Sequence, residues 1–205
     1  MADWRNSEAE TTSKEEEAEL LRQLAKGNEA AFSSLYESYH GPIYRFAWHM
    51  SGNRATADEI TQEVFLLLIG NPRAYDPAKG SVAGYLFGIA RNLTRRTLLQ
   101  RRLDIPLEDE EDLGEWADGG FASHPDVLAE ISQQELLDCL RKAVPALPES
   151  YREVIVLCEM EEMSYADAAA ILRCPPGTVA SRLHRAREIL KMRLTRQRER
   201  QRCER

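Results

Sequence analysis

The sequence has little of what marks secreted, membrane-spanning or metal-binding proteins. Its four cysteines, Cys139, Cys158, Cys174 and Cys203, are scattered, with no C-x-x-C pair and no histidine cluster nearby. This spacing suits neither a zinc site nor a disulfide framework, so we expect reduced thiols that pack as small apolar side chains. No apolar run approaches the roughly 18 residues of a membrane span, and the acidic N-terminus lacks a secretory signal. These absences predict a cytoplasmic protein.

Strand signals are also missing, because no segment reads convincingly as part of a sheet. The chain has 205 residues, 43% of them hydrophobic, which is enough for one or two small domains with cores of their own. Apolar residues at helical spacing, with capping signals at the ends, predict helices over residues 13–26, 28–52, 56–70 and 81–102. Within the third of these, Thr56 and Glu59 fit a capping box.

An acidic stretch divides the chain. Between Asp104 and Asp138 there are twelve acidic residues and no lysine or arginine. Its first part also contains prolines and glycines, which predicts a flexible, solvated connector, and helical periodicity returns at Ile131. We therefore expect an all-α protein of two small helical domains, residues 15–103 and 131–195, joined by a flexible acidic linker over residues 104–130.

The C-terminal domain carries the pattern of a helix-turn-helix. A helix over residues 164–172, with Ser164 as N-cap, is followed by the breaker Cys174-Pro175-Pro176-Gly177 and by a second helix from Thr178. Four apolar residues of the second helix should form a buried stripe: Val179, Leu183, Ala186 and Leu190. The remaining faces carry polar and basic side chains suited to base edges and phosphates: Thr178, Ser181, His184 and Arg185, flanked by Arg182 and Arg187.

A plain helical hairpin with a solvated basic face is the alternative to a DNA-reading motif. Charge favours the DNA-reading interpretation. From Thr178 to Arg205 there are ten lysines and arginines against three acids, although the whole chain has a formal net charge of -7. Such a local excess of positive charge in an acidic protein points to a nucleic-acid partner.

The helix over residues 56–70 allows two interpretations. Its inward stripe would be Ile60, Val64, Leu67 and Leu68. The residues that this leaves facing outward are Asp58, Gln62, Phe65, Leu66 and Ile69. An outward apolar patch with polar neighbours suggests a protein-binding face. Alternatively, another helix of the same domain covers Phe65 and Ile69, and the acids are only solvated charges; the helical wheel favours neither.

The helix over residues 81–102 should bury Val82, Leu86, Ile89 and Leu93. Its far side would then present Arg91, Arg95 and Arg102, within a stretch of five arginines and no acid. Such a stripe attracts a phosphate backbone. In the loop before this helix, Tyr75 beside Lys79 could stack on an unpaired base, although a tyrosine packed on its own domain is the commoner arrangement.

Five segments in this order resemble a known family: GNEAAFSSLYESY, ADEITQEVFLLL, GYLFGIARNLTRR, LPESYREVIVLCEMEEMSYADAAAIL and CPPGTVASRLHRARE. From about Glu19 to Leu194 the chain is similar to the extracytoplasmic function (ECF, group 4) sigma factors, the promoter-recognition subunits of bacterial RNA polymerase. It departs from the usual family pattern at Tyr85, Arg96 and Ala180, where tryptophan, an acid and a basic residue are common. These departures concern promoter sequence and DNA melting rather than the general role.

The resemblance implies three sites and no catalytic residue, cofactor or metal. A polymerase-binding face, docking on the clamp helices of the largest subunit, would comprise Asp58, Gln62, Glu63 and Phe65. Capture of a flipped base of the minus-10 element would involve Tyr75, Lys79, Arg91 and Arg95. The minus-35 element would be read from the helix that starts at Thr178, by Ser181, Arg182, His184, Arg185 and Arg187. The resemblance also implies an anti-sigma protein as a regulatory partner.

Three other functions are weaker interpretations. The first is an enzyme with Asp58, Glu59, Gln62 and Glu63 as metal ligands, but no histidine accompanies these acids and no phosphate-binding glycine loop is present. The second is an operator-binding dimer, which explains only the C-terminal domain and predicts tight duplex binding without polymerase. The third is a purely protein-binding adaptor, which would leave the arginine-rich helices unused.

Overall fold

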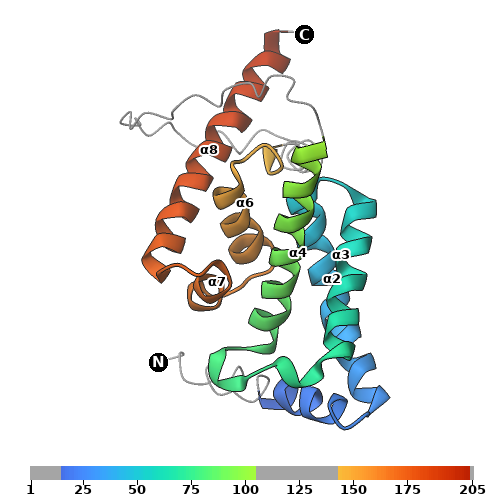
Figure 1. Cartoon of the computed structure of the whole chain (residues 1–205). Coiled ribbons are helices and arrows are strands. Elements are labelled where there is room, and N and C mark those ends of the chain that lie inside the picture. The colour runs from blue at the N-terminus through green and yellow to red at the C-terminus, as the bar shows by residue number, and fades with distance from the viewer. Residues whose placement is uncertain (1–14, 105–142, 204–205) are drawn as a thin grey trace.

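The computed structural model describes residues 15–104 and 143–203, and within these ranges it contains helices and turns but no strand (Figure 1). A first helix covers residues 15–24. It is followed by α2 (Glu29–Ser51), α3 (Arg54–Gly70), the short turns η1 (Pro72–Ala74) and η2 (Pro77–Lys79), and α4 (Val82–Asp104). The second half contains α6 (Glu149–Ile155), the π-turn η4 (Val156–Met160), α7 (Tyr165–Leu172) and α8 (Pro176–Cys203). No helix in the described ranges is both long and apolar enough to cross a bilayer. The predicted linker, apart from Asp104, and the helical return at Ile131 lie outside the described residues.

The first half is a bundle of α2, α3 and α4 around large apolar side chains. Leu35, Ile43 and Leu86 are fully buried, and the rings of Phe46 and Phe87 meet edge to face with centroids 5.6 Å apart. Each such side chain contributes about 1.5–3 kcal/mol through burial. The long apolar stripes of these helices therefore fix the bundle, which in turn sets the direction of their remaining faces.

Local signals define the ends of α2 and the start of α3. The side chain of Asn28 accepts a hydrogen bond from the backbone N–H of Ala30, and Gly52, with φ at 67°, ends α2 in the left-handed region that favours glycine. The predicted cap of α3 is wrong by one turn. Asn53 is the N-cap, accepting hydrogen bonds from the backbone N–H and hydroxyl of Thr56 at 3.0 and 3.2 Å. Thr56 is buried inside the helix.

The helix-turn-helix forms as predicted. The Ser164 hydroxyl accepts a hydrogen bond from the Asp167 N–H at 3.1 Å, which caps α7. All four residues of the predicted stripe on α8 are buried: Val179, Leu183, Ala186 and Leu190. However, α8 begins at Pro176, two residues earlier than expected, because proline is well tolerated in the first turn of a helix.

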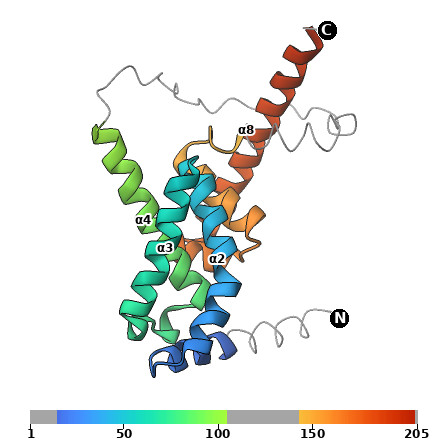
Figure 2. The same ribbon diagram turned by 90° about the vertical axis from the view of Figure 1, so that its right-hand side faces the viewer.

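The two halves pack against each other rather than standing apart. Helix α4 lies between α2 and α3 on one side and α6 and α7 on the other (Figure 1), and in the turned view α8 projects beyond the bundle (Figure 2). Buried residues of both halves form one continuous apolar cluster. One face of α4 is consequently covered by the second half, and this covering determines which of its arginines face solvent.

Candidate nucleic-acid and protein interfaces

The DNA-reading face predicted on α8 is largely open. Ser181, His184 and Arg187 are exposed, and the other three predicted residues, Thr178, Arg182 and Arg185, are half-buried. Ser181 donates a hydrogen bond to the Thr178 carbonyl at 3.0 Å, so its hydroxyl still has acceptor capacity. Arg187 forms an ion pair with Glu159, which belongs to the π-turn before α7. The face thus combines short polar groups with guanidinium groups on one side of a well-anchored helix.

The arginine stripe on α4 is not the solvent-facing surface predicted from the sequence. Arg91 is 8% exposed, and its Nε and Nη2 donate to the two carboxylate oxygens of Glu153 at 2.5 and 3.2 Å. Its Nη1 also donates to the Ile171 carbonyl at 3.4 Å. The outward placement of Arg91 is therefore wrong for this structure. A helical wheel describes one helix alone and takes no account of α6 and α7, which cover this side.

Arg95, one turn further along α4, remains half exposed. Its Nε lies 2.9 Å from Oε1 of Glu149, which makes an ion pair without hydrogen-bond geometry. The side chain of Arg102 lies outside the described residues. Of the predicted stripe, Arg95 is thus partly accessible to solvent, whereas Arg91 is buried.

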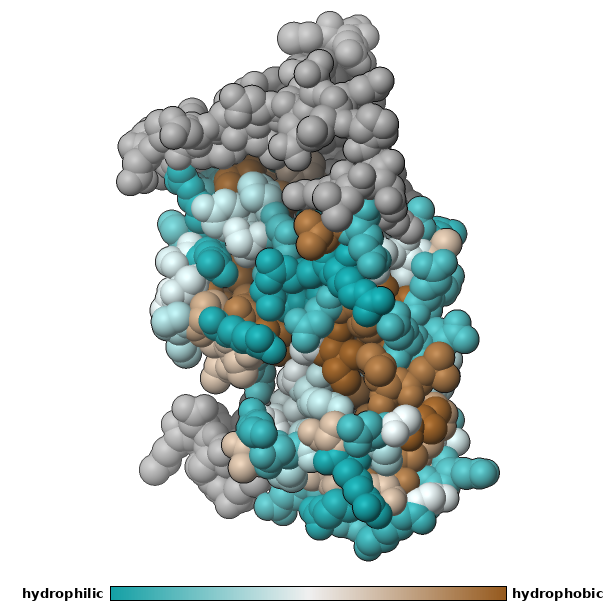
Figure 3. Space-filling view, in the orientation of Figure 1, coloured by the Kyte–Doolittle hydropathy of each residue, from teal (hydrophilic) through white to brown (hydrophobic). Residues whose placement is uncertain are grey.

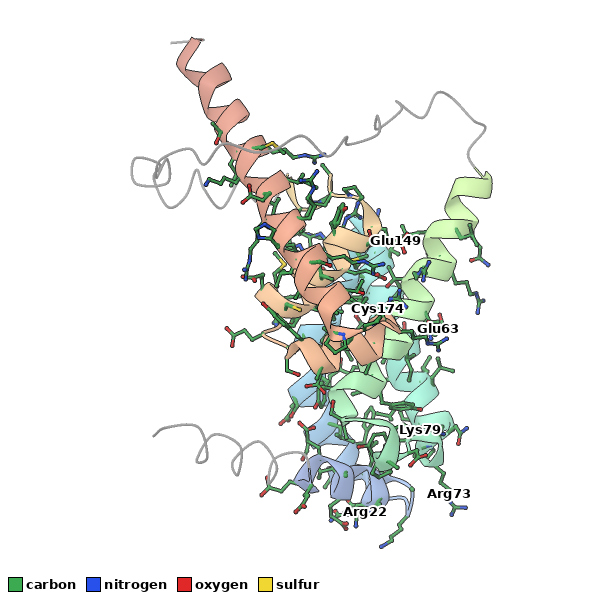
Figure 4. All side chains as sticks on the ribbon, turned by 90° about the vertical axis from the view of Figure 1, so that its left-hand side faces the viewer. Arg22, Glu63, Arg73, Lys79, Glu149 and Cys174 are labelled. Carbon is green, nitrogen blue, oxygen red and sulfur yellow. The ribbon has the colours of Figure 1, made fainter. Side chains whose placement is uncertain are left out.

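The loop before α4 holds Tyr75 and Lys79 at the end of the molecule away from Glu149, as Figure 4 shows for Lys79. Tyr75 is half-buried, its hydroxyl donates to the Gly80 carbonyl at 3.0 Å, and its ring centroid lies 5.6 Å from that of Tyr85. Burial raises the pKa of the Tyr75 phenol. Lys79 is exposed and pairs with Asp76 at 3.3 Å. Tyr75 therefore packs on its own domain here, with part of its surface still accessible.

On α3, the polar residues of the predicted docking face are exposed, but the apolar ones are not distributed as the wheel predicts. Asp58, Gln62 and Glu63 face solvent. Phe65, expected outside, is 3% exposed, whereas Leu67, expected inside, is 47% exposed. The predictions for Phe65 and Leu67 are therefore wrong. Phe65 is buried because aromatic side chains of α2 cover it.

Phe65 forms the floor of a hollow between α2 and α3. Its ring meets Phe32 edge to face at 6.1 Å and lies 4.8 Å from Tyr36. The hollow has a volume of about 420 Å³ and is lined by Phe32, Tyr36, His40, Asp58, Thr61, Gln62, Phe65, Leu66 and Ile69. Leu66 and Ile69 are 59% and 49% exposed. Figure 3 shows apolar surface on the right-hand side of the molecule, where Figure 1 places α3. Both alternatives for this helix thus hold in part: Phe65 is covered, while an apolar patch remains outside.

The sequence analysis missed the groups that join the two halves. Besides Arg91 and Glu153, Arg45 of α2 binds Glu161, with Nε–Oε1 and Nη2–Oε2 distances of 3.0 and 2.7 Å. The Glu161 side chain is 3% exposed, and burial raises the pKa of its carboxyl while Arg45 opposes that shift. Arg152 also donates to the Met50 carbonyl at 2.8 Å. No local signal marks such pairs, because the partners are 62 to 116 residues apart.

Two family models match the chain. Residues 35–103 match Sigma-70 region 2, and residues 137–190 match Sigma-70 region 4. The chain is 30% identical over 181 residues to the ECF RNA polymerase sigma factor SigW of Bacillus subtilis, a match that covers 85% of this chain and 94% of SigW. It is 31% identical over 178 residues to the ECF RNA polymerase sigma-E factor of Escherichia coli, covering 83% and 90% of the two chains.

Solved structures share the fold. CnrH, in complex with the cytosolic domain of CnrY, matches with a TM-score of 0.64 at 23% identity, covering 87% of this chain and 97% of CnrH. The sigma factor RpoE of Bartonella quintana, in complex with the anti-sigma factor NepR, matches with a TM-score of 0.61 at 24% identity, covering 80% and 96%. Together with the sequence matches, the helical fold and its helix-turn-helix establish that this chain belongs to the extracytoplasmic function sigma factors, which direct RNA polymerase to promoters.

Proposed function

We propose that this chain is a group 4 sigma factor that brings core RNA polymerase to specific promoters and helps to open the DNA in a stress or signal response. It acts in the cytoplasm, where polymerase and chromosome are found, and has no enzymatic activity of its own. Residues 15–103 serve polymerase binding and minus-10 recognition, residues 131–195 serve minus-35 recognition, and residues 104–130 connect them. The observation that carries the proposal is the exposed polar and basic face of α8, held opposite a fully buried stripe.

The minus-35 element is read by α8. A helix presented in this way fits the major groove, where short polar side chains contact base edges and arginines contact guanine or phosphate. Ser181 and His184 are exposed toward such a partner, and Arg185 and Arg182 lie beside them. Thr178 and Arg187, toward the two ends of this face, contact phosphates.

The face of α3 around the hollow docks on the clamp helices of the polymerase largest subunit. Asp58, Gln62 and Glu63 provide exposed polar contacts. Leu66 and Ile69 supply the apolar area that a protein interface buries at its centre. Phe65 acts indirectly in this arrangement, because it supports the hollow from within.

The loop and α4 act on the minus-10 element. Opening a duplex costs a few kcal/mol per extruded base, and a stacking surface offsets part of that cost. The accessible part of the Tyr75 ring and the ammonium group of Lys79 provide stacking and charge. Arg95 and, once it is uncovered, Arg91 bind the phosphates of the opened strand.

An anti-sigma protein regulates the chain. The Bartonella RpoE, which shares its fold, was solved with the anti-sigma factor NepR, and CnrH, which also shares it, was solved with the cytosolic domain of CnrY. A protein that covers the α3 face or wedges between the two halves would block polymerase binding or promoter contact.

The test is transcription with purified components. Core polymerase mixed with this chain should start transcripts at defined sites across the host genomic DNA, whereas the chain alone should bind duplex DNA weakly. Tight operator binding by a dimer without polymerase would instead favour an ordinary repressor or activator. Failure to associate with core polymerase, with any inhibitor removed, would overturn the proposal.

Replacing Arg185 with alanine should weaken promoter binding by the holoenzyme by about 1–3 kcal/mol and relax the preference at one position of the minus-35 element. The measurement is binding to promoters carrying each base in turn at that element. Lys191, an exposed basic residue nearly two turns further along α8, is the control: Lys191→Ala should leave the base preference unchanged. An unchanged preference in Arg185→Ala would remove this residue from the reading face.

A further inference from the structure

Acidic side chains of residues 149–162, which comprise α6, η4 and the two residues that follow, are bound to arginines of the first half. Glu153 binds Arg91, Glu149 pairs with Arg95, and Glu161 binds Arg45. A fourth acid of the same segment, Glu159, pairs with Arg187 within its own half. Three of the arginines proposed for DNA contact, Arg91, Arg95 and Arg187, are therefore neutralised by glutamates from one stretch of the chain.

We propose that Glu153 and Glu149 occupy the phosphate-binding arginines of α4 and keep the closed chain from binding DNA until its two halves separate. The inference rests on the proposed function, because it takes Arg91 and Arg95 as groups that bind the opened strand. It adds an intramolecular competitor for that strand. The competitor is the second half of the same molecule, and its carboxylates stand where phosphate oxygens would bind.

The Arg91–Glu153 contact has the geometry that a phosphate would use. Nε and Nη2 of the guanidinium group each meet a different carboxylate oxygen, at 2.5 and 3.2 Å. This two-pronged arrangement is how arginine recognises both carboxylates and phosphates. A phosphate and Glu153 therefore compete for the same donors, and Arg91 cannot serve both.

Because the Arg91–Glu153 pair is buried, DNA can replace Glu153 only if the interface between the two halves opens. The side chains of Arg91 and Glu153 are 10% and 4% exposed, so a DNA strand cannot reach Arg91 by displacing a flexible surface group. Glu153 is part of α6, between the buried Val154 and the hydrogen-bonded Arg152, and cannot swing out alone. Arg91 becomes available only when α6 and α7 move away from α4.

Closure leaves the other two proposed interfaces open. Asp58, Gln62 and Glu63 on α3 are exposed, and α3 itself lies on the other side of α4 from α6 and α7 (Figure 1). Ser181 and His184 on α8 are exposed as well. The closed chain can thus meet polymerase through α3 while its strand-binding arginines are still covered, which places docking before strand capture.

The test compares the full-length chain with Glu153→Gln and Glu149→Gln, using a short fluorescent single-stranded DNA of mixed sequence in the absence of polymerase. Losing the Glu153 carboxylate favours separation of the two halves. This raises the fraction of chains that can bind DNA and lowers the apparent Kd in proportion. We expect Glu153→Gln to bind at least about tenfold more tightly than the parent, with a steeper salt dependence. Glu149→Gln should give a smaller gain, because Arg95 is already half exposed. Solution scattering should show a larger radius of gyration for Glu153→Gln.

The matched control is Glu162→Gln, which removes one negative charge from an exposed acid of the same segment. It should bind the DNA no more than about twofold more tightly than the parent. Adding Arg91→Ala to Glu153→Gln should abolish the gain. Equal affinity of the parent and of both glutamate variants, or an equal gain in Glu162→Gln, would overturn the proposal. Transcription by the parent chain with core polymerase is tested separately. If no promoter-specific transcripts form there, the proposed function fails, whereas the DNA-binding assay alone decides whether Glu153 and Glu149 cover the arginines.

Discussion

Replacing Leu66 with glutamate should weaken the binding of core polymerase by about thirtyfold or more, the effect of losing a residue at the centre of an interface. Leu66 is 59% exposed at the rim of the hollow between α2 and α3. In the proposed complex, docking removes that side chain from water, and a carboxylate there would have to be desolvated without a partner.

Leu99 offers a closely matched control. It is also a leucine, 61% exposed, but it lies on α4, outside the hollow. Leu99→Glu should bind polymerase within about threefold of the parent chain, and both variants should keep the parent's unfolding free energy to within about 0.5 kcal/mol because both positions face solvent. Affinities can be measured by competition for labelled core enzyme. Equal losses in the two variants, or none in Leu66→Glu, would remove the α3 face from polymerase binding.

Replacing Phe65 with alanine should lower the free energy of unfolding by about 3–5 kcal/mol, the usual cost of removing a buried aromatic ring. Phe65 is 3% exposed and packs against Phe32 and Tyr36. Its loss leaves a cavity at the junction of α2 and α3 and removes the floor of the hollow. Urea denaturation followed by circular dichroism measures the change.

Phe65→Leu separates stability from docking, because leucine refills most of the space and should cost less than half as much. If Phe65 only supports the hollow, polymerase affinity should follow stability across the two variants, with Phe65→Leu close to the parent. A Phe65→Ala chain that unfolds like the parent but fails to bind polymerase would show instead that the ring contacts polymerase directly.

Features set by local sequence were predictable. The helix-turn-helix depends on Ser164 as a cap, on a proline-rich breaker and on an apolar stripe, all within 28 residues, and each forms as expected except for the start of α8. The all-helical fold follows from the same kind of signal. Such features arise because capping and periodicity act over a few turns of chain.

Features set by packing between helices were not predictable in the same way. The wheel of α3 leaves Phe65 outside, but two aromatic residues of α2 bring it into the core and leave Leu67 exposed instead. The same limit applies to Arg91. Arg91 is bound by the carboxylate of Glu153, 62 residues away. No local sequence signal near Arg91 indicates that partner. The polar residues of the proposed docking face, Asp58, Gln62 and Glu63, needed no such partner and are exposed as expected.

The continuity of α8 has a mechanical consequence. This helix has 28 residues, so it is a rod about 42 Å long. The buried stripe from Val179 to Leu190 anchors its first half, and its last turns project past the bundle (Figure 2). A rod anchored near one end converts a small push at the far tip into a rotation of the anchored end. A molecule that binds the free end of α8 would therefore change the angle at which Ser181 and His184 approach the proposed DNA groove.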